Sequence, residues 1–304
     1  MEEAPLIASD KELGTLMGRL IGEPCLALDT EASSFHRFHE RIGLIQLSNR
    51  TETYLLDPLS LGDMSTLGGI ISGESTEIVI HDADYDLRLL KRMYGFRVRN
   101  IFDTLIAAEL LNEPGLSLAA LLKKYFDIQL DKRFQKADWS RRPLSSEMLA
   151  YAAMDTRHLI ALRDLLAEQL KAKGRWEWAV EEFGLLTEVP FRTETDDTPG
   201  YLRIKGAKLL KPKELAILKE LHAWRDGVAS RLDRAPFMVV GNDVLIGLAK
   251  EPTTDRKELS QRKGIGDSTM KKNATALLQA VKRGLDTPRE EWPKLPRPKR
   301  HPRD

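Results

Sequence analysis

The chain has 304 residues, of which 42% are apolar and 31% are charged, a balance typical of a protein that buries a substantial core. Its 47 basic and 46 acidic residues leave a formal net charge of +1, so the overall charge neither indicates nor excludes a nucleic-acid partner. No apolar run approaches the roughly 20 residues that cross a bilayer, and the acidic first residues lack the features of a secretory signal. We therefore expect no membrane contact and a cytoplasmic location.

The first half of the chain alternates short β-rich runs with helical patterns, which indicates an α/β domain. The expected strands and helices lie, in chain order, at residues 25–29, 42–48, 53–57, 67–71, 77–81 and 86–94. Cys25, the single cysteine, stands in the first of these strands next to apolar residues. It has no partner for an internal disulfide, so we expect a packed thiol rather than a reactive one.

From Asp103 onward the pattern becomes helical, with apolar residues at helical spacing. The expected helices cover residues 105–111 and 118–126, followed by one long helix over 148–170. Ser145 precedes the long helix, and its hydroxyl is a suitable cap for the free amides of the first turn. These helices are expected to cover the sheet formed by the earlier strands.

Changes in composition divide the chain into parts. A polar stretch with prolines and no period follows the first helical region and is predicted to be a linker. A second helical module comes next, and the chain ends in a basic, proline-rich segment that we expect to be extended or disordered. The predicted parts are a first domain over residues 1–186, a linker over 187–210, a helical domain over 211–285 and a tail over 286–304.

Two acidic residues mark the end of the first expected strand. Asp29 and Glu31 lie two positions apart, so their carboxylates leave the same face of the sheet. This spacing places two hard oxygen ligands side by side. The alternative is a pair of solvent-facing acids, which is common at strand ends.

A second group of acids follows the strand at residues 77–81. Asp82 and Asp84 stand where helix caps are expected, whereas Asp86 lies one turn into the next helix and can point back over the sheet edge. Periodicity does not choose among the three.

The long helix carries a third candidate pair. Tyr151 and Asp155 are four residues apart, so the phenol and the carboxylate share one helix face. The alternative for Tyr151 is a half-buried aromatic side chain without a chemical role.

Taken together, these segments resemble the three exonuclease motifs of the DEDD superfamily, in its tyrosine-bearing branch. The chain is most similar to the ribonuclease D family, over roughly residues 22 to 170. The similarity implies an α/β, ribonuclease H-like mixed sheet flanked by helices. It is carried by LDTEASSFHRFHERIGLIQLS, HDADYDLRLL, NIFDTLIAAELL, GLSLAALLKKYF, DKRFQKADWSRRPLS and MLAYAAMDTRHL.

The resemblance implies a role for each site residue. It assigns the metal ligands to Asp29, Glu31, Asp86 and Asp155, and it selects Asp86 over its two acidic neighbours. Tyr151 matches a phenol that orients water, and Glu31 matches a residue that also contacts the terminal 3′-hydroxyl. Because all these ligands are hard oxygen atoms, two divalent cations, Mg²⁺ or Mn²⁺, are the expected cofactors.

The resemblance also implies an activity. We expect a two-metal 3′→5′ exoribonuclease that releases nucleoside 5′-monophosphates from single-stranded RNA 3′ ends, in processing of tRNA or other structured RNA. No obligate protein partner is evident. The alternatives are a 3′→5′ DNA exonuclease, a nucleic-acid-binding protein without catalysis, and a scaffold.

Other residues are candidates for contact with nucleic acid or for structural roles. In the loop at residues 131–145, Arg141 and Arg142 are candidate phosphate contacts, and Trp139 either stacks on a base or anchors the loop. Asp103 is expected to cap a helix, and His81 to be a packed residue at a strand end.

The module over residues 211–285 resembles the HRDC domain, an all-α bundle. This resemblance implies auxiliary nucleic-acid binding, and basic residues around the GIG turn at residues 264–266 are suitable for phosphate contact. The alternative is a solvated basic face.

Overall fold

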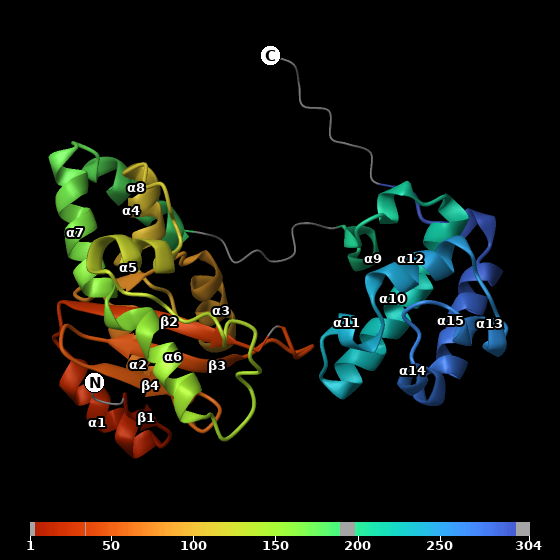
Figure 1. The fold of residues 1–304 in the computed structure, drawn as a ribbon, viewed down its shortest axis with the longest axis horizontal. Coiled ribbons are helices and arrows are strands. Elements are labelled where there is room, and N and C mark those ends of the chain that lie inside the picture. Colours follow the sequence, from red (N-terminus) through yellow and green to blue (C-terminus); the bar gives the residue numbers. More distant parts are fainter. Residues whose placement is uncertain (1–3, 34, 189–197, 296–304) are drawn as a thin grey trace, which may run out of the picture. The chain divides into compact units, whose positions relative to one another are not determined.

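The structure is a computed structural model that describes residues 4–33, 35–188 and 198–295 (Figure 1). It contains two compact units, each with its own hydrophobic core, and His36–His39 are grouped with the second unit. No helix in the described part of the chain is both long and apolar enough to cross a membrane.

A six-stranded mixed sheet organises the first unit, which confirms the predicted fold class. The strands run in the spatial order β1-β4-β3-β2-β5-β6. The pairs β2–β3 and β3–β4 are antiparallel, whereas β1–β4, β2–β5 and β5–β6 are parallel. The bounds are β1 Leu6–Ile7, β2 Cys25–Ala32, β3 Ile42–Ser48, β4 Thr53–Leu56, β5 Glu77–Ile80 and β6 Ile101–Asp103.

Eight helices flank this sheet in the described residues of the first unit (Figure 1). The helix α6 packs against β2, β3 and β4, and α7 packs against β2 and β5. The bounds are α1 Asp10–Leu20, α2 Ser65–Ile71, α3 Asp84–Tyr94, α4 Thr104–Leu110, α5 Leu118–Phe126, α6 Ser146–Arg157, α7 Leu159–Ala172 and α8 Trp176–Glu188.

The long helix predicted over residues 148–170 is in fact two helices. Ser145 caps α6 by accepting a hydrogen bond from the Met148 amide, as expected. The helix α6 ends at Arg157, His158 has a φ of −110° and a ψ of 0°, and α7 starts at the residue after it. Apolar spacing continues across this break, so the sequence pattern did not reveal it.

Two cores are formed by the first unit. The large core includes Cys25, whose thiol is buried as predicted, and burial raises its pKa to about 12. The second is a small core beneath α6, formed by Leu44, Leu55, Trp139, Ala152 and Ala153.

All the regular secondary structure in the described residues of the second unit is helical. The predicted linker over 187–210 is too long, because Leu202, Ile204, Ala207 and Leu210 belong to the core of this unit, and α8 extends to Glu188.

The helices of the second unit have the following bounds: α9 Gly200–Arg203, η1 Ala207–Leu209, α10 Pro212–Leu232, α11 Pro236–Val239, α12 Asn242–Lys250, α13 Arg256–Ser260, α14 Asp267–Lys272, α15 Ala274–Asp286 and η2 Arg289–Glu291.

The predicted tail is ordered in part. The Trp292 indole donates a hydrogen bond to the Thr287 carbonyl next to the short helix η2, so this part is not extended throughout. Residues 296–304 of the predicted tail lie outside the described residues.

Candidate active site

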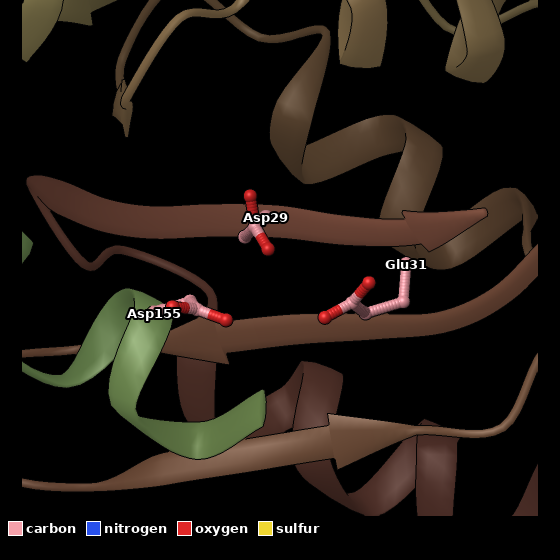
Figure 2. A group of neighbouring side chains, drawn as sticks. All are labelled: Asp29, Glu31 and Asp155. Carbon is pink, nitrogen blue, oxygen red and sulfur yellow. The ribbon is translucent and has the colours of Figure 1, made fainter. Parts of the chain in front are cut away.

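Three of the predicted metal ligands lie together. Asp29 and Glu31 on β2 and Asp155 on α6 each offer a carboxylate oxygen, and these atoms all lie within 4.8 Å of one another. Figure 2 shows the side chains of Asp29 and Glu31 on the same side of the strand, facing the end of the Asp155 side chain. The spacing of two residues along the strand therefore places both carboxylates on one face of the sheet, as predicted.

The surrounding structure fixes both elements of this cluster. Strand β2 is paired with β3 on one side and β5 on the other, and its register shifts between Glu31 and Ala32. The helix α6 is tied to the sheet next to Asp155, because the hydroxyl groups of Thr156 and Ser48 are 2.8 Å apart and hydrogen-bonded. Neither element can slide without losing buried polar contacts.

Asp86 lies close to the cluster but outside it. Its carboxylate accepts a hydrogen bond from the Thr30 hydroxyl, and the side chain is buried. Its charge nevertheless contributes to the raised pKa values of Asp29 and Glu31, after the larger effect of burial. The carboxyl group is thus near enough to affect them electrostatically, but the assignment of Asp86 as a direct metal ligand stays a prediction.

The two acids near Asp86 do not have the helix-capping role that was expected of them. The N-cap of α3 is Ala83, and neither Asp82 nor Asp84 caps the helix with its side chain. Asp103 instead accepts hydrogen bonds from the amides of Asp82 and Ala83, and it also caps α4 through the Leu105 amide. The predicted capping role of Asp103 is confirmed and extends to a second segment.

His81 lies at the end of β5, as expected for a packed residue. Its Nδ1 atom is 2.9 Å from the Thr104 hydroxyl, and burial lowers the pKa of the imidazole. It is not among the three clustered ligands, although it lines the cleft in front of them.

The carboxyl groups of the site have pKa values far above their ordinary range. Burial raises the pKa of Glu31 to about 9, with further contributions from the charges of Asp155 and Asp86. Burial also raises the pKa of Asp86 and of Asp155 to about 7, and that of Asp29 well above its usual value. Burial is the largest cause at all four groups, and repulsion from neighbouring charges in the site adds to it at Asp29 and Glu31.

This donor set fits a hard divalent cation. The three clustered groups supply only oxygen atoms, which Mg²⁺ and Mn²⁺ prefer over softer ligands. A cation bound there would stabilise the charged carboxylates, and so offset the burial that raises the pKa values of all three groups and the repulsion that adds to it at Asp29 and Glu31. We therefore assign the candidate metal centre to this cluster, with Asp86 beside it.

Stability in the absence of metal should decrease with rising pH. The folded-state pKa values of about 9 for Glu31 and about 7 for Asp155 lie above the unfolded values near 4, so the folded chain holds more protons. This contribution to stability is complete below about pH 4 and is lost as the pH rises through about 7 and about 9. Urea unfolding in chelator from pH 5 to 9.5 measures the decrease, which Glu31→Gln should reduce. Identical pH profiles of stability for the unaltered protein and Glu31→Gln would contradict the raised pKa of Glu31.

Tyr151 completes the site. It is half-buried between Phe134, at a ring-centroid distance of 5.8 Å, and Trp139, at 6.1 Å. Burial, followed by the charges of Asp155 and Glu31, raises the pKa of the phenol above its ordinary value. The alternative for Tyr151 was a half-buried aromatic side chain without a chemical role. Its ring is indeed packed in this way, but Tyr151 also lines the cleft that contains the acids.

The cleft itself has a volume of about 560 Å³. Most of the residues that line the cleft were not predicted from the sequence. Many of them belong to the loops before α5 and α6. The only signal was the similarity of these loops to the family as a whole. The residues lining it are Asp29, Glu31, His81, Asp82, Leu105, Leu116, Ser117, Leu118, Ala119, Leu130, Asp131, Lys132, Gln135, Tyr151 and Asp155.

The structure corrects two of the three predicted nucleic-acid contacts. Trp139 is only 1% exposed and packs in the small core beneath α6, so it anchors the loop and its ring is not available to stack on a base. The Arg142 guanidinium binds both carboxylate oxygens of Asp57 and donates to the carbonyls of Gly43 and Trp139. A Cβ atom at Gly43 would lie 2.5 Å from the Trp139 carbonyl, which shows how closely the loop approaches β3.

Arg141 and Arg142 should therefore respond differently to replacement by alanine. Arg142→Ala leaves the buried Asp57 carboxylate without its partner and should cost about 3 kcal/mol of unfolding free energy. Arg141 has an 80% exposed side chain and a 3.3 Å pair with Asp138, so its loss should leave stability nearly unchanged and weaken RNA binding. Urea unfolding and RNA titrations measure the two effects, and equal losses of stability would contradict this distinction.

Two families of known proteins match this chain. The family described as 3′-5′ exonuclease matches residues 6–171, and the HRDC domain matches residues 214–281. Ribonuclease D of Pseudomonas paraeruginosa is 30% identical over 91% of this chain and 73% of its own. Exosome complex component 10 of mouse is 34% identical over 81% of this chain but only 29% of its own. The crystal structure of Escherichia coli RNase D, an exoribonuclease involved in structured RNA processing, has a TM-score of 0.77 at 27% identity, covering 97% of this chain and 78% of its own.

Proposed function

This chain belongs to the ribonuclease D family of 3′-5′ exoribonucleases, and we propose that it hydrolyses RNA from the 3′ end with two divalent cations, Mg²⁺ or Mn²⁺. The observation that carries the proposal is the carboxylate cluster of Asp29, Glu31 and Asp155, with Asp86 at its side and Tyr151 in the same cleft. A cytoplasmic location and the absence of an obligate protein partner stay predictions.

The reaction is hydrolysis of the last phosphodiester bond. A water oxygen bonds to phosphorus, the bond from phosphorus to the 3′-oxygen breaks, and the products are a nucleoside 5′-monophosphate and an RNA with a new 3′-hydroxyl. When bound by the clustered acids, the cations would supply an acidified water and charge stabilisation of the leaving oxygen.

The roles of the cleft residues follow from their environment. The raised pKa of Tyr151 keeps its phenol protonated at neutral pH, so it orients the attacking water through its hydroxyl instead of removing a proton. We assign to Glu31 the additional role of accepting a hydrogen bond from the terminal 3′-hydroxyl. Such a contact explains why hydrolysis would start at a chain end.

The substrate class is tested by one assay. The protein is incubated with matched RNA and DNA oligomers, labelled at either end, in Mg²⁺, Mn²⁺ or chelator. We expect RNA to be shortened stepwise from its 3′ end to mononucleotides only when a cation is present. Preferred hydrolysis of DNA would identify the DNA exonuclease instead, and binding without hydrolysis would identify a non-catalytic protein. Single-stranded ends of structured RNA, including tRNA precursors, are the first substrates to compare.

The HRDC domain is proposed to add RNA affinity. Lys263 lies beside the turn that leads into α14, Lys271 and Lys272 lie in the last turn of this helix, and all three are suited to phosphate contact. Removing residues 200–304 should weaken RNA binding, with the larger loss at low salt, and should leave hydrolysis of saturating short oligomers intact. Filter binding from 50 to 300 mM salt measures this effect. Equal affinities for the two proteins would reject the role.

A further inference from the structure

Gln46 is a buried polar residue whose position the proposed chemistry has not yet explained. It lies in the middle of β3 with a relative exposure of 0%. Among the described residues, neither its Oε1 nor its Nε2 atom has a hydrogen-bond partner. Buried amide groups without partners are rare in folded proteins, because each loses its hydrogen bonds to water.

The register of the sheet places Gln46 next to the acidic cluster. Gln46 is the direct cross-strand partner of Asp29 in the antiparallel β2–β3 pair. Directly opposed residues on one face have Cβ atoms about 4.5 to 5.5 Å apart, which is within reach of a glutamine amide and a carboxylate. On its other side, Gln46 is paired with Leu55 of β4.

The contacts of neighbouring residues show that Gln46 faces the site. Leu44 lies two residues before it and packs in the small core beneath α6, and Ser48 lies two residues after it and bonds to Thr156 of that helix. Residues two apart on a strand share a face, so Gln46 also points toward α6. Asp29 points the same way, since it clusters with Asp155 (Figure 2).

We propose that Gln46 is a positioning residue for the metal centre, whose amide N–H donates a hydrogen bond to the Asp29 carboxylate when a cation is bound and so fixes its orientation toward the cation. A carboxylate that binds a metal with one oxygen can accept such a bond with its other lone pairs. Partners of this kind hold metal ligands in place, and their loss commonly weakens metal affinity about 10- to 100-fold. The inference rests on the proposed metal site.

The competing explanation is a structural water. Trp139 in the same small core also has an unpaired Nε1 atom, and a water bound between it and Gln46 could satisfy both groups. That arrangement would make Gln46 important for stability without linking it to metal binding. The two explanations predict opposite results for a variant that keeps the volume but removes the amide.

Gln46→Met is that variant, with Leu55→Met as the matched control in the same core. Mn²⁺ affinity is measured by titration calorimetry, and stability by urea unfolding in chelator. We expect Gln46→Met to bind Mn²⁺ at least about tenfold more weakly, yet to be as stable as the unaltered protein without metal. Leu55→Met should retain Mn²⁺ affinity within about twofold, because it changes packing alone.

The turnover of RNA provides a second readout. At saturating Mn²⁺, kcat for Gln46→Met should recover toward that of the unaltered protein, with KM for RNA unchanged throughout. Equal Mn²⁺ affinity in both proteins, or a loss of stability in chelator, would overturn the role of Gln46 and favour the water. Absence of Mn²⁺ binding by the unaltered protein would instead contradict the proposed metal site itself.

Discussion

Replacing Asp29 with alanine should lower the rate of hydrolysis at RNA 3′ ends by at least about a thousandfold. Asp29 is one of the three clustered acids, with Glu31 on the same strand β2 and Asp155 on α6. A metal centre contributes several kcal/mol of charge stabilisation, and each 1.36 kcal/mol corresponds to a factor of ten in rate. Single-turnover hydrolysis of an end-labelled RNA in Mg²⁺ measures the effect.

The fold should survive this change. The carboxyl of Asp29 is held in a site whose burial and neighbouring charges raise its pKa, so its removal relieves repulsion in the metal-free protein. We expect unfolding in chelator to require at least as much urea as before. Asp164→Ala, which removes a partly exposed acid on α7 that is paired with Arg50, is the matched control and should retain full activity. Undiminished hydrolysis by a pure Asp29→Ala preparation would be incompatible with the metal centre.

The sequence predicted the cluster well where a regular period applies. Side chains alternate along a strand, so Asp29 and Glu31 were placed on one face without knowledge of the rest of the fold. Helical spacing likewise placed Tyr151 and Asp155 together, and both line the cleft. The strand order β4-β3-β2-β5 was not predicted, because pairing depends on contacts between distant segments.

Prediction failed where the backbone leaves regular structure. The chain turns at Asp82 with a φ of 61°, so the direction of the following helix cannot be inferred from spacing. The role of Asp86 therefore depended on resemblance to the family. Trp139 and Arg142 lie in a loop without a period, and only the close approach of this loop to Gly43 reveals that they hold it in place. In the sequence alone, Arg142 looks like a phosphate contact, and Trp139 fits either a base contact or an anchor of the loop.

Tyr151→Phe should lower kcat about 10²- to 10⁴-fold, the usual contribution of a group that acts on a proton or a water in the transition state. The change removes one oxygen atom and keeps the ring that packs against Phe134 and Trp139, so stability should change little. Metal affinity should be retained, because the phenol is not one of the clustered ligands. Rapid-quench kinetics and Mn²⁺ titration give the two quantities on the same preparation.

The pH dependence of this variant separates water orientation from proton removal. A phenol with a raised pKa stays protonated across the neutral range, so if Tyr151 only orients water, Tyr151→Phe should lower the rate by the same factor from pH 6 to pH 9. A tyrosinate acting as the base would give a defect that grows with pH, because its population rises. Tyr54→Phe is the control, since the Tyr54 hydroxyl donates to Glu52 outside the cleft, and it should leave kcat unchanged. A Tyr151→Phe protein with an unchanged rate would remove this phenol from the mechanism and leave the acids to orient the water alone.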